Sequence, residues 1–135
     1  MIDRILLVSP VSPFNPQSGG QQRTALLHNA LKAFGPVDVL LIEPAATKSH
    51  LNKPANGILA HGFWHQRPLG INKFQPDKKL NKALSINGVD LSQYSLIVGR
   101  YLNPISKLAI PHHVKTIVDL DDWGYNYSSA KSASL

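Results

Sequence analysis

The sequence predicts a three-layer α/β domain of Rossmann-like type, with helices on both faces of a mainly parallel sheet. Two observations lead to this fold class. Short apolar runs, each of the length of a buried strand, alternate along the chain with segments of helical spacing. The 135 residues are 43% hydrophobic and only 16% charged, which suits one compact domain and disfavours wholesale disorder. Residues 1–135 are therefore expected to form a single domain.

The first predicted unit is a strand, a helix and a second strand. The apolar run Ile5–Val8 is typical of a strand buried on both faces, and the segment 9–20, rich in proline and glycine, predicts a long loop. The apolar residues of Gln21–Phe34 recur at helical spacing and are followed by a Gly-Pro pair, so a helix is expected there. The run Val37–Ile42 then supplies a second strand, parallel to the first.

The rest of the chain continues this alternation less regularly. Segment 43–77 is mostly loop-forming, with one candidate strand inside it, and Asn87 with Gly88 marks a later turn. The sheet is thus expected to have four or five strands. The further elements expected are strands at Ile58–Trp64, Leu96–Gly99 and Val114–Leu120 and helices at Lys78–Ile86 and Pro104–Ala109.

The residues that follow each strand are the candidate binding residues. Open α/β sheets bind ligands beyond the carboxyl ends of their strands. Because the strands are expected to be parallel, these ends should converge on one edge of the sheet. The positions concerned are Ser9–Gly20, Glu43, Arg100 with Tyr101, and Asp119–Tyr125.

Ser18, Gly19 and Gly20 stand directly before the first predicted helix. Glycines at that place let backbone N–H groups approach a ligand closely, and the helix dipole favours a phosphate or a carboxylate. The alternative is structural, because two glycines also permit a tight entry into the helix. Neither the dinucleotide-binding spacing Gly-x-Gly-x-x-Gly nor the Walker pattern is present, so a nicotinamide cofactor and P-loop chemistry are disfavoured.

Charged residues follow the two last predicted strands. Arg100, with Tyr101 beside it, could fork onto a phosphate or carboxylate or serve as a structural arginine. Asp119 and Asp121 share one face of an extended strand and could together hold a divalent cation. Alternatively, Asp119 binds loop amides while Asp121 or Asp122 caps the next turn. We expect mixed roles, with at least one carboxylate facing the ligand. The histidines lack the spacing of a metal site, so no metal ion is expected.

The formal charge of +6 comes from one stretch of the chain. Residues 48–82 contain seven basic residues and a single acid, Asp77, while the rest of the chain sums to zero. We expect peripheral contact of this segment with an anionic membrane, the alternative being a solvated lysine-rich face. Nucleic acid is a disfavoured partner because no nucleic-acid-binding module is recognised. The absence of cysteine, of a signal-peptide pattern and of a long apolar run predicts a cytoplasmic protein.

Three segments of the chain follow one another in an order known from an enzyme family. The first segment is Arg4–Pro10, followed by the loop Phe14–Gly20 of pattern Phe-x-Pro-x-Ser-Gly-Gly and then by Arg23. The second segment is Val98–Tyr101 and the third is Val118–Asp122. Together they resemble the opening strand, the glycine loop and the late strands of one half of a two-domain fold. That half is the N-terminal domain of GT-B fold retaining glycosyltransferases of the glycosyltransferase-family-four type. The likeness covers most of the chain except the basic middle.

The resemblance implies a transferase that moves a sugar from a nucleotide-sugar donor to an acceptor with retention of anomeric configuration. In such enzymes two Rossmann-like domains face each other, and the N-terminal one mainly holds the acceptor, a sugar or a lipid-linked acceptor. The resemblance puts Gly19 and Gly20 against the phosphate or sugar of the donor. It puts Asp121 where many relatives have a histidine beside the reacting sugar, so Asp121 is the catalytic candidate. The residues implied to line the cleft are Ser18, Arg23, Arg100, Tyr101 and Asp122.

The donor half of such an enzyme has no counterpart in the sequence. Glu43 is the only glutamate, so the family's paired glutamates are missing, and its Arg/Lys pair for the leaving diphosphate is not found either. Without that electrostatic stabilisation, the chain is expected to be a truncated N-terminal domain that is inactive alone. No cofactor is expected, and a nucleotide-sugar donor only in the full-length enzyme. The alternative function is a stand-alone flavodoxin-like or Rossmann-like module that binds a phosphate-bearing ligand.

Overall fold

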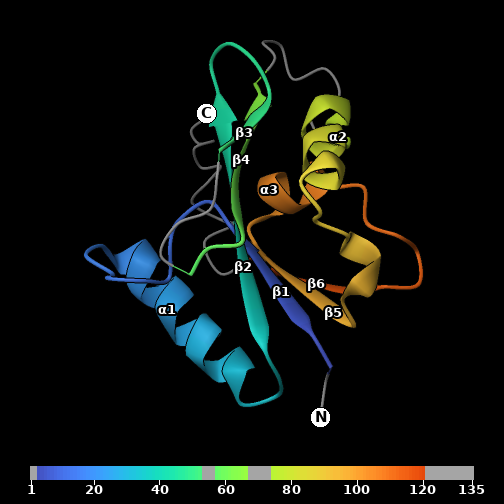
Figure 1. Ribbon diagram of the computed structural model, residues 1–135. Helices are drawn as coiled ribbons and strands as arrows, with labels where there is room; N and C mark the ends of the chain where they lie inside the picture. Colours follow the sequence, from blue (N-terminus) through green and yellow to red (C-terminus); the bar gives the residue numbers. More distant parts are fainter. Residues whose placement is uncertain (1–2, 53–56, 67–73, 121–135) are drawn as a thin grey trace.

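A six-stranded sheet with helices on both faces makes up the part of the chain that the computed structural model describes, residues 3–52, 57–66 and 74–120 (Figure 1). The arrangement confirms the predicted α/β class with a mainly parallel sheet. Its strands are β1 (Ile5–Ser9), β2 (Val37–Ala45), β3 (His50–Asn52), β4 (Ala60–His65), β5 (Leu96–Arg100) and β6 (Lys115–Asp119). Its helices are α1 (Gly19–Lys32), α2 (Lys78–Ile86) and α3 (Leu102–Ser106), with a 3₁₀ turn, η2 (Leu91–Gln93), before β5.

The strands lie in the order β3-β4-β2-β1-β5-β6. All neighbouring pairs are parallel except β3 with β4, which is antiparallel. The chain therefore leaves β1 toward β2 on one side and later returns to its other side with β5. In open α/β sheets such a reversal of strand order opens a crevice beyond the carboxyl ends of the strands. The carboxyl ends of β1 and β5 are thus the place where the fold itself predicts a ligand.

Strand β1 lies inside the sheet and all of its residues are buried. Successive side chains of a strand point to opposite faces, so its apolar run supplies both layers of the core. Ile5 and Leu7 pack on the face of α1 with Leu31. Leu6 and Val8 belong to the larger core on the other face, which α2 and α3 cover. A continuous apolar run, rather than an alternating one, is what a strand covered on both faces requires.

Strand β3 corrects the predicted number of strands. His50–Asn52 lies in a segment for which the sequence predicts no element, yet it pairs with β4, with His50 opposite Phe63. A strand of three residues is too short to show a hydrophobic period, and its backbone groups find partners only once β4 is in place. The described sheet therefore has six strands rather than four or five.

The boundaries of α1 also differ from those predicted, because the capping residues decide them. The helix begins at Gly19 rather than Gln21, since the Ser18 side chain accepts a hydrogen bond from the backbone N–H of Gln21 at 3.2 Å. The Gln21 side chain in return accepts from the backbone N–H of Ser18 at 3.2 Å, which completes a capping box. The helix ends at Lys32, two residues before the predicted end.

Two later elements are shifted as well. Helix α3 occupies Leu102–Ser106 rather than the predicted Pro104–Ala109, because it starts directly after β5 with Pro104 inside its first turn. Strand β2 continues three residues past the predicted end at Ile42, so that Glu43 lies within the strand and pairs with Phe63 of β4. The extension puts a carboxylate on the surface of the sheet instead of in a loop.

Candidate functional site

Polar residues lie at the level of the sheet where β1 and β5 end, a level beyond which β2 and β4 continue. Ser9, the last residue of β1, is level with Leu41 of β2, which is level with His61 of β4. On the other side of β1, Arg100 ends β5 and is level with Asp119, the last residue of β6. Side chains at one level of neighbouring parallel strands point to the same face. We call this set the carboxyl-edge site, and it lies on the face that α1 covers.

The glycine loop leads from β1 into α1 at this edge. The Ser18 hydroxyl is engaged in the helix cap described above. A Cβ built on Gly19 or on Gly20 would meet no atom within 4 Å, and neither residue has a positive φ. The first N–H groups of a helix have no partner inside it. The entry to α1 therefore leaves the N–H groups of Gly19 and Gly20 without a partner inside the helix, an arrangement that favours an anion.

Arg23 lies on α1, three residues beyond Gly20, and its side chain is exposed. Residues three apart are neighbours on a helix surface, so this guanidinium lies near the entry to the helix. It adds positive charge to the end of the helix that already favours anions. Gly19, Gly20 and Arg23 thus lie together in the first turns of α1, and their contact with a donor stays a prediction.

Arg100 is fully buried, with 0% of its surface exposed. Its Nη1 donates to Oδ2 of Asp119 at 3.0 Å, its Nε donates to the Thr24 hydroxyl at 3.2 Å, and its Nη2 donates to the Tyr101 hydroxyl at 3.1 Å. The guanidinium also lies over the Tyr101 ring, 4.6 Å from its centroid. Arg100 therefore joins α1, β5 and β6. This is the role of a structural arginine, one of the two alternatives that the sequence leaves open. A contact with a ligand stays a prediction.

Tyr101 has a backbone φ of 73°, one of two positive values at non-glycine residues in the described part of the chain. Such a conformation costs on the order of 1–3 kcal/mol in a residue with a side chain, and it is concentrated at functional sites. The strain turns the chain sharply from β5 into α3 and puts the Tyr101 hydroxyl against Arg100. No pattern in the sequence predicted this feature, because it depends on the packing of α3 behind β5.

The acidic end of β6 is described only up to Leu120. Asp119 is bound to Arg100, so one of its oxygens is engaged inside the fold. Asp121 and Asp122, the catalytic and cleft-lining candidates, lie outside the described residues. Within the described ranges, no group of three His, Cys, Asp or Glu side chains could hold a metal ion.

The other side of the carboxyl-edge site carries a histidine and the chain's single glutamate. Nε2 of His61 lies 2.5 Å from Oε2 of Glu43, and the two side chains are 30% and 38% exposed. The His61 ring stacks on Phe63 at a centroid distance of 4.5 Å, and Phe63 stacks with His50 at 4.5 Å. The sequence predicts Glu43 at this edge but not its partner, His61. Only the pairing of β2 with β4 reveals it, because the two residues are far apart in the chain.

The basic segment is described in part. Lys48, Lys78, Lys79 and Lys82 are exposed, and the last three lie on α2. Lys53, Arg67 and Lys73 fall outside the described residues. No helix in the described ranges has the length and the hydropathy that crossing a membrane requires.

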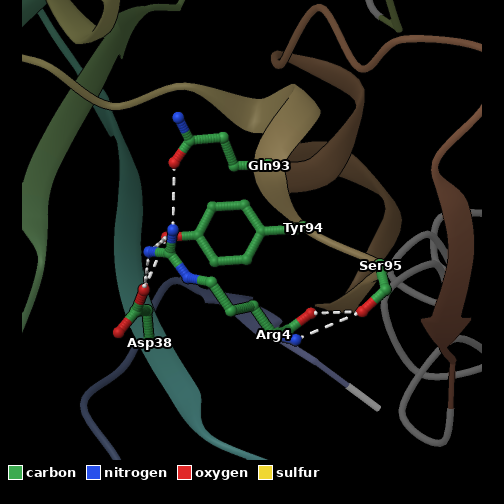
Figure 2. Close-up of polar contacts among 5 residues, drawn as sticks. All are labelled: Arg4, Asp38, Gln93, Tyr94 and Ser95. Carbon is green, nitrogen blue, oxygen red and sulfur yellow. Dashed lines mark hydrogen bonds and ion pairs between the residues drawn. The ribbon is translucent and has the colours of Figure 1, made fainter.

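The opposite edge of the sheet holds a separate polar network, shown in Figure 2. Arg4 Nη2 donates to Oδ2 of Asp38 at 2.9 Å, the Tyr94 hydroxyl donates to the same oxygen at 2.6 Å, and Arg4 Nη1 donates to Gln93 at 3.0 Å. The backbone of Arg4 is bound to the Ser95 hydroxyl. Arg4 precedes β1, Asp38 begins β2 and Tyr94 precedes β5, so the network joins three strand starts, far along the strands from the glycine loop.

Comparison with protein-family models, with curated proteins and with solved structures finds no match to this chain. The carboxyl-edge site and the adjoining entry to α1 together present helix N–H donors, an exposed arginine on α1 and a partly exposed His-Glu pair, groups that can bind an anion and hydroxyl groups.

Proposed function

We propose that this chain is the acceptor-binding half of a retaining glycosyltransferase, which transfers a sugar from a nucleotide-sugar donor once a second domain supplies the donor site. The proposal starts from the resemblance of its three motifs to a GT-B N-terminal domain. It is supported by the position of those motifs. The glycine loop, the end of β5 and the end of β6 belong to one edge of one sheet, the edge at which open α/β sheets bind ligands.

The observation that carries the proposal is the open space in front of Gly19 and Gly20. Glycine in a helix costs roughly 0.5–1 kcal/mol relative to alanine. The fold does not need glycine at these positions, because a methyl group would meet nothing and the backbone has no positive φ. In the proposal, the missing side chains make room for the phosphate or sugar of the donor, which the first N–H groups of α1 attract.

In this proposal the residues of the chain bind and orient the donor and the acceptor. The entry to α1 and Arg23 attract the anionic donor, and the partly exposed side chains of β2 and β4 bind the acceptor. Stabilisation of the leaving diphosphate belongs to the second domain, because this chain has one glutamate and no recognisable basic pair. The chain by itself is therefore proposed to bind an acceptor without transferring a sugar to it.

The exposed surface of α2 supports an acceptor held at a membrane. Lys78, Lys79 and Lys82 are exposed there, Ile86 is 73% exposed, and Phe74 ahead of the helix is 45% exposed. Cationic and apolar side chains exposed together suit an anionic lipid surface. We propose a sugar or lipid-linked acceptor that is presented at such a surface.

Sedimentation with vesicles tests the membrane part. The chain should pellet with phosphatidylserine-containing vesicles but not with neutral phosphatidylcholine ones, and Lys79→Glu with Lys82→Glu should weaken this. Lys115→Glu with Lys32→Glu, both at exposed positions outside segment 48–82, is the matched control for lost charge away from α2. If both double variants lose vesicle binding equally, or if the chain binds RNA as tightly as vesicles, a lipid-binding surface on α2 is contradicted.

Glycine variants test the transferase part. In the protein encoded by the complete reading frame, Gly19→Ala and Gly20→Ala should each lower sugar transfer at least tenfold, while the free energy of unfolding stays equal or rises. Asn29→Ala, on the exposed side of α1, is the control. Undiminished transfer contradicts the proposal, as does a reading frame that encodes no second α/β domain with a basic pair and paired glutamates. Tight, saturable binding of a nucleotide or flavin by the 135-residue chain would favour the phosphate-binding module instead.

A further inference from the structure

The pair formed by Glu43 and His61 presents one open hydrogen-bond acceptor. A carboxylate only accepts hydrogen bonds, so Nε2 of His61 carries the hydrogen in the 2.5 Å contact. In the neutral imidazole ring, Nδ1 then carries the lone pair. None of the described residues donates a hydrogen bond to that nitrogen. The glutamate thus selects the tautomer of His61, as the acidic residue of a catalytic triad does.

The orientation of the His61 ring is held by a second contact. The ring stacks on Phe63 with an interplanar angle of 24°, and Phe63 stacks with His50 at 11°. His50 is itself bound through Nδ1 to the carbonyl oxygen of Lys48 at 3.0 Å. A side chain held both by stacking and by a hydrogen bond loses little further freedom when it binds a ligand.

The pair also lies where a ligand can reach it. His61 is level with Ser9, the residue from which the glycine loop leaves β1. Glu43 follows two residues after Leu41 on the same face. Both side chains are partly exposed, at 30% for His61 and 38% for Glu43. The open nitrogen therefore belongs to the carboxyl-edge site and not to the core.

Stabilisation of the fold accounts for little of the pairing of Glu43 with His61. A hydrogen-bonded pair of side chains exposed to this degree contributes about 0–1 kcal/mol to stability, and glutamate is depleted in strands. The only glutamate of the chain is nevertheless found inside β2, opposite Phe63, with its carboxylate on His61. A metal ion does not explain it either, because the described residues contain no group of three suitable side chains.

We propose that Nδ1 of His61 accepts a hydrogen bond from a hydroxyl group of a polyol or sugar acceptor. Glu43 is the positioning residue that keeps the hydrogen on Nε2. The inference rests on the proposed function and adds to it the chemical group of the acceptor that this edge recognises. The alternative ligand, a phosphate group without a hydroxyl donor, would find no donor at Nδ1 and belongs at the entry to α1.

Nitrogen-15 NMR of the labelled chain tests the proposal directly. Long-range correlations should show the Nε2-protonated tautomer of His61 in the free protein. Addition of myo-inositol or methyl α-D-glucopyranoside should shift its Nδ1 resonance saturably, whereas inorganic phosphate should shift the amide resonances of Gly19 and Gly20 instead. Glu43→Gln should lose the tautomer preference and weaken polyol binding about fivefold, the equivalent of one hydrogen bond of ~1 kcal/mol.

His61→Phe keeps a ring to stack on Phe63 and removes both nitrogens, so it should abolish polyol binding. His112→Phe, exposed and outside the carboxyl-edge site, is the matched control and should leave binding unchanged. Polyol binding that survives His61→Phe, or an Nδ1-protonated tautomer in the free protein, overturns the His61 inference and leaves the proposed function in place. Absence of polyol binding in the wild-type chain overturns it too. If tight nucleotide binding accompanies that absence, the proposed function fails as well.

Discussion

Arg100 and Asp119 form an ion pair across the carboxyl ends of β5 and β6, with 3.0 Å between Nη1 and Oδ2. The arginine is fully buried while the aspartate is 34% exposed at the side chain. A buried guanidinium is stable only with partners, because taking its charge out of water is costly. The pair, with Thr24 of α1, therefore fixes the position of three elements around the carboxyl-edge site.

Asp119→Ala should lower the free energy of unfolding by about 2–3 kcal/mol, because it leaves a buried charge without its carboxylate. Urea denaturation followed by circular dichroism measures the change. Asp3→Ala, at an exposed position, is the control and should change stability by less than about 0.5 kcal/mol. Equal effects of the two substitutions would show that the Arg100 pair contributes nothing to the fold.

Gly99→Ala should destabilise the protein by about 1–3 kcal/mol through overpacking. A Cβ at this position would lie 2.5 Å from Cδ1 and 2.9 Å from Cβ of Ile105 in α3. The Cβ of Ile105 cannot move without the helix, so a rotamer change does not relieve the contact. Gly19→Ala, where the added methyl group meets nothing, is the matched control and should be neutral or stabilising. Thermal unfolding of both variants measures the difference. Equal unfolding midpoints would contradict the close packing of α3 on Gly99.

Tyr94 should make the protein less stable in alkaline solution. Burial and then the hydrogen bond to Asp38 raise the pKa of Tyr94 above its ordinary value of about 10. Above about pH 10 the unfolded chain loses this proton while the folded chain keeps it. The free energy of unfolding therefore falls as the pH rises further, until the folded tyrosine also ionises. Below pH 10 this contribution is fully present.

Tyr94→Phe tests this dependence. The variant should be about 1 kcal/mol less stable at neutral pH, since Asp38 loses a hydrogen-bond donor. Its stability should also fall less steeply than that of the wild type above about pH 10. Guanidinium unfolding at a series of pH values measures both effects. Parallel curves for the two proteins would contradict the raised pKa of Tyr94.

His28 should make the protein less stable in mildly acidic solution. Burial and, to a lesser extent, the charge of Lys32 lower the pKa of His28 below its ordinary value of about 6.5. Its ring meets Phe14 edge-on at 5.3 Å. Below about pH 6.5 the unfolded chain binds the proton and the folded chain resists it, so stability is full above that pH and falls as the pH drops.

His28→Leu should remove this part of the acid dependence below about pH 6.5. The measurement is the urea midpoint at each pH. His112→Leu, at an exposed position, should keep the wild-type slope. A wild-type slope in His28→Leu would mean that other groups cause the acid dependence.

The elements with strong local patterns were predicted correctly in kind. The apolar run of β1, the helical spacing of α1 and α2 and the runs of β2 and β5 are all properties of neighbouring residues, which a sequence displays directly. The boundaries moved by a few residues where a cap or a pairing strand decided them, as Ser18 does for α1. Strand β3 escaped prediction because three residues show no period of their own.

The candidate site was predictable as a place but not as a set of contacts. Arg100 and the glycine loop, expected at one edge of the sheet, lie where β5 and β1 end, whereas Glu43 lies inside β2 and not after it. The partners of Glu43 and Arg100 were not foreseen, since sequence alone does not say which strands are neighbours. Tyr101 likewise shows its positive φ only in the folded chain.

The sequence by itself determined the α/β class, the order of the main elements and the edge that carries polar groups, because hydrophobic period, glycine and proline act over a few residues. Only the tertiary structure decided which side chains meet. The strand order β3-β4-β2-β1-β5-β6 brings Glu43 to His61 and Arg100 to Asp119 across 18 and 19 residues of chain. The strand order thereby buries Arg100, a predicted ligand-binding residue, and leaves Nδ1 of His61 open. Burial and pairing are properties of the packed sheet.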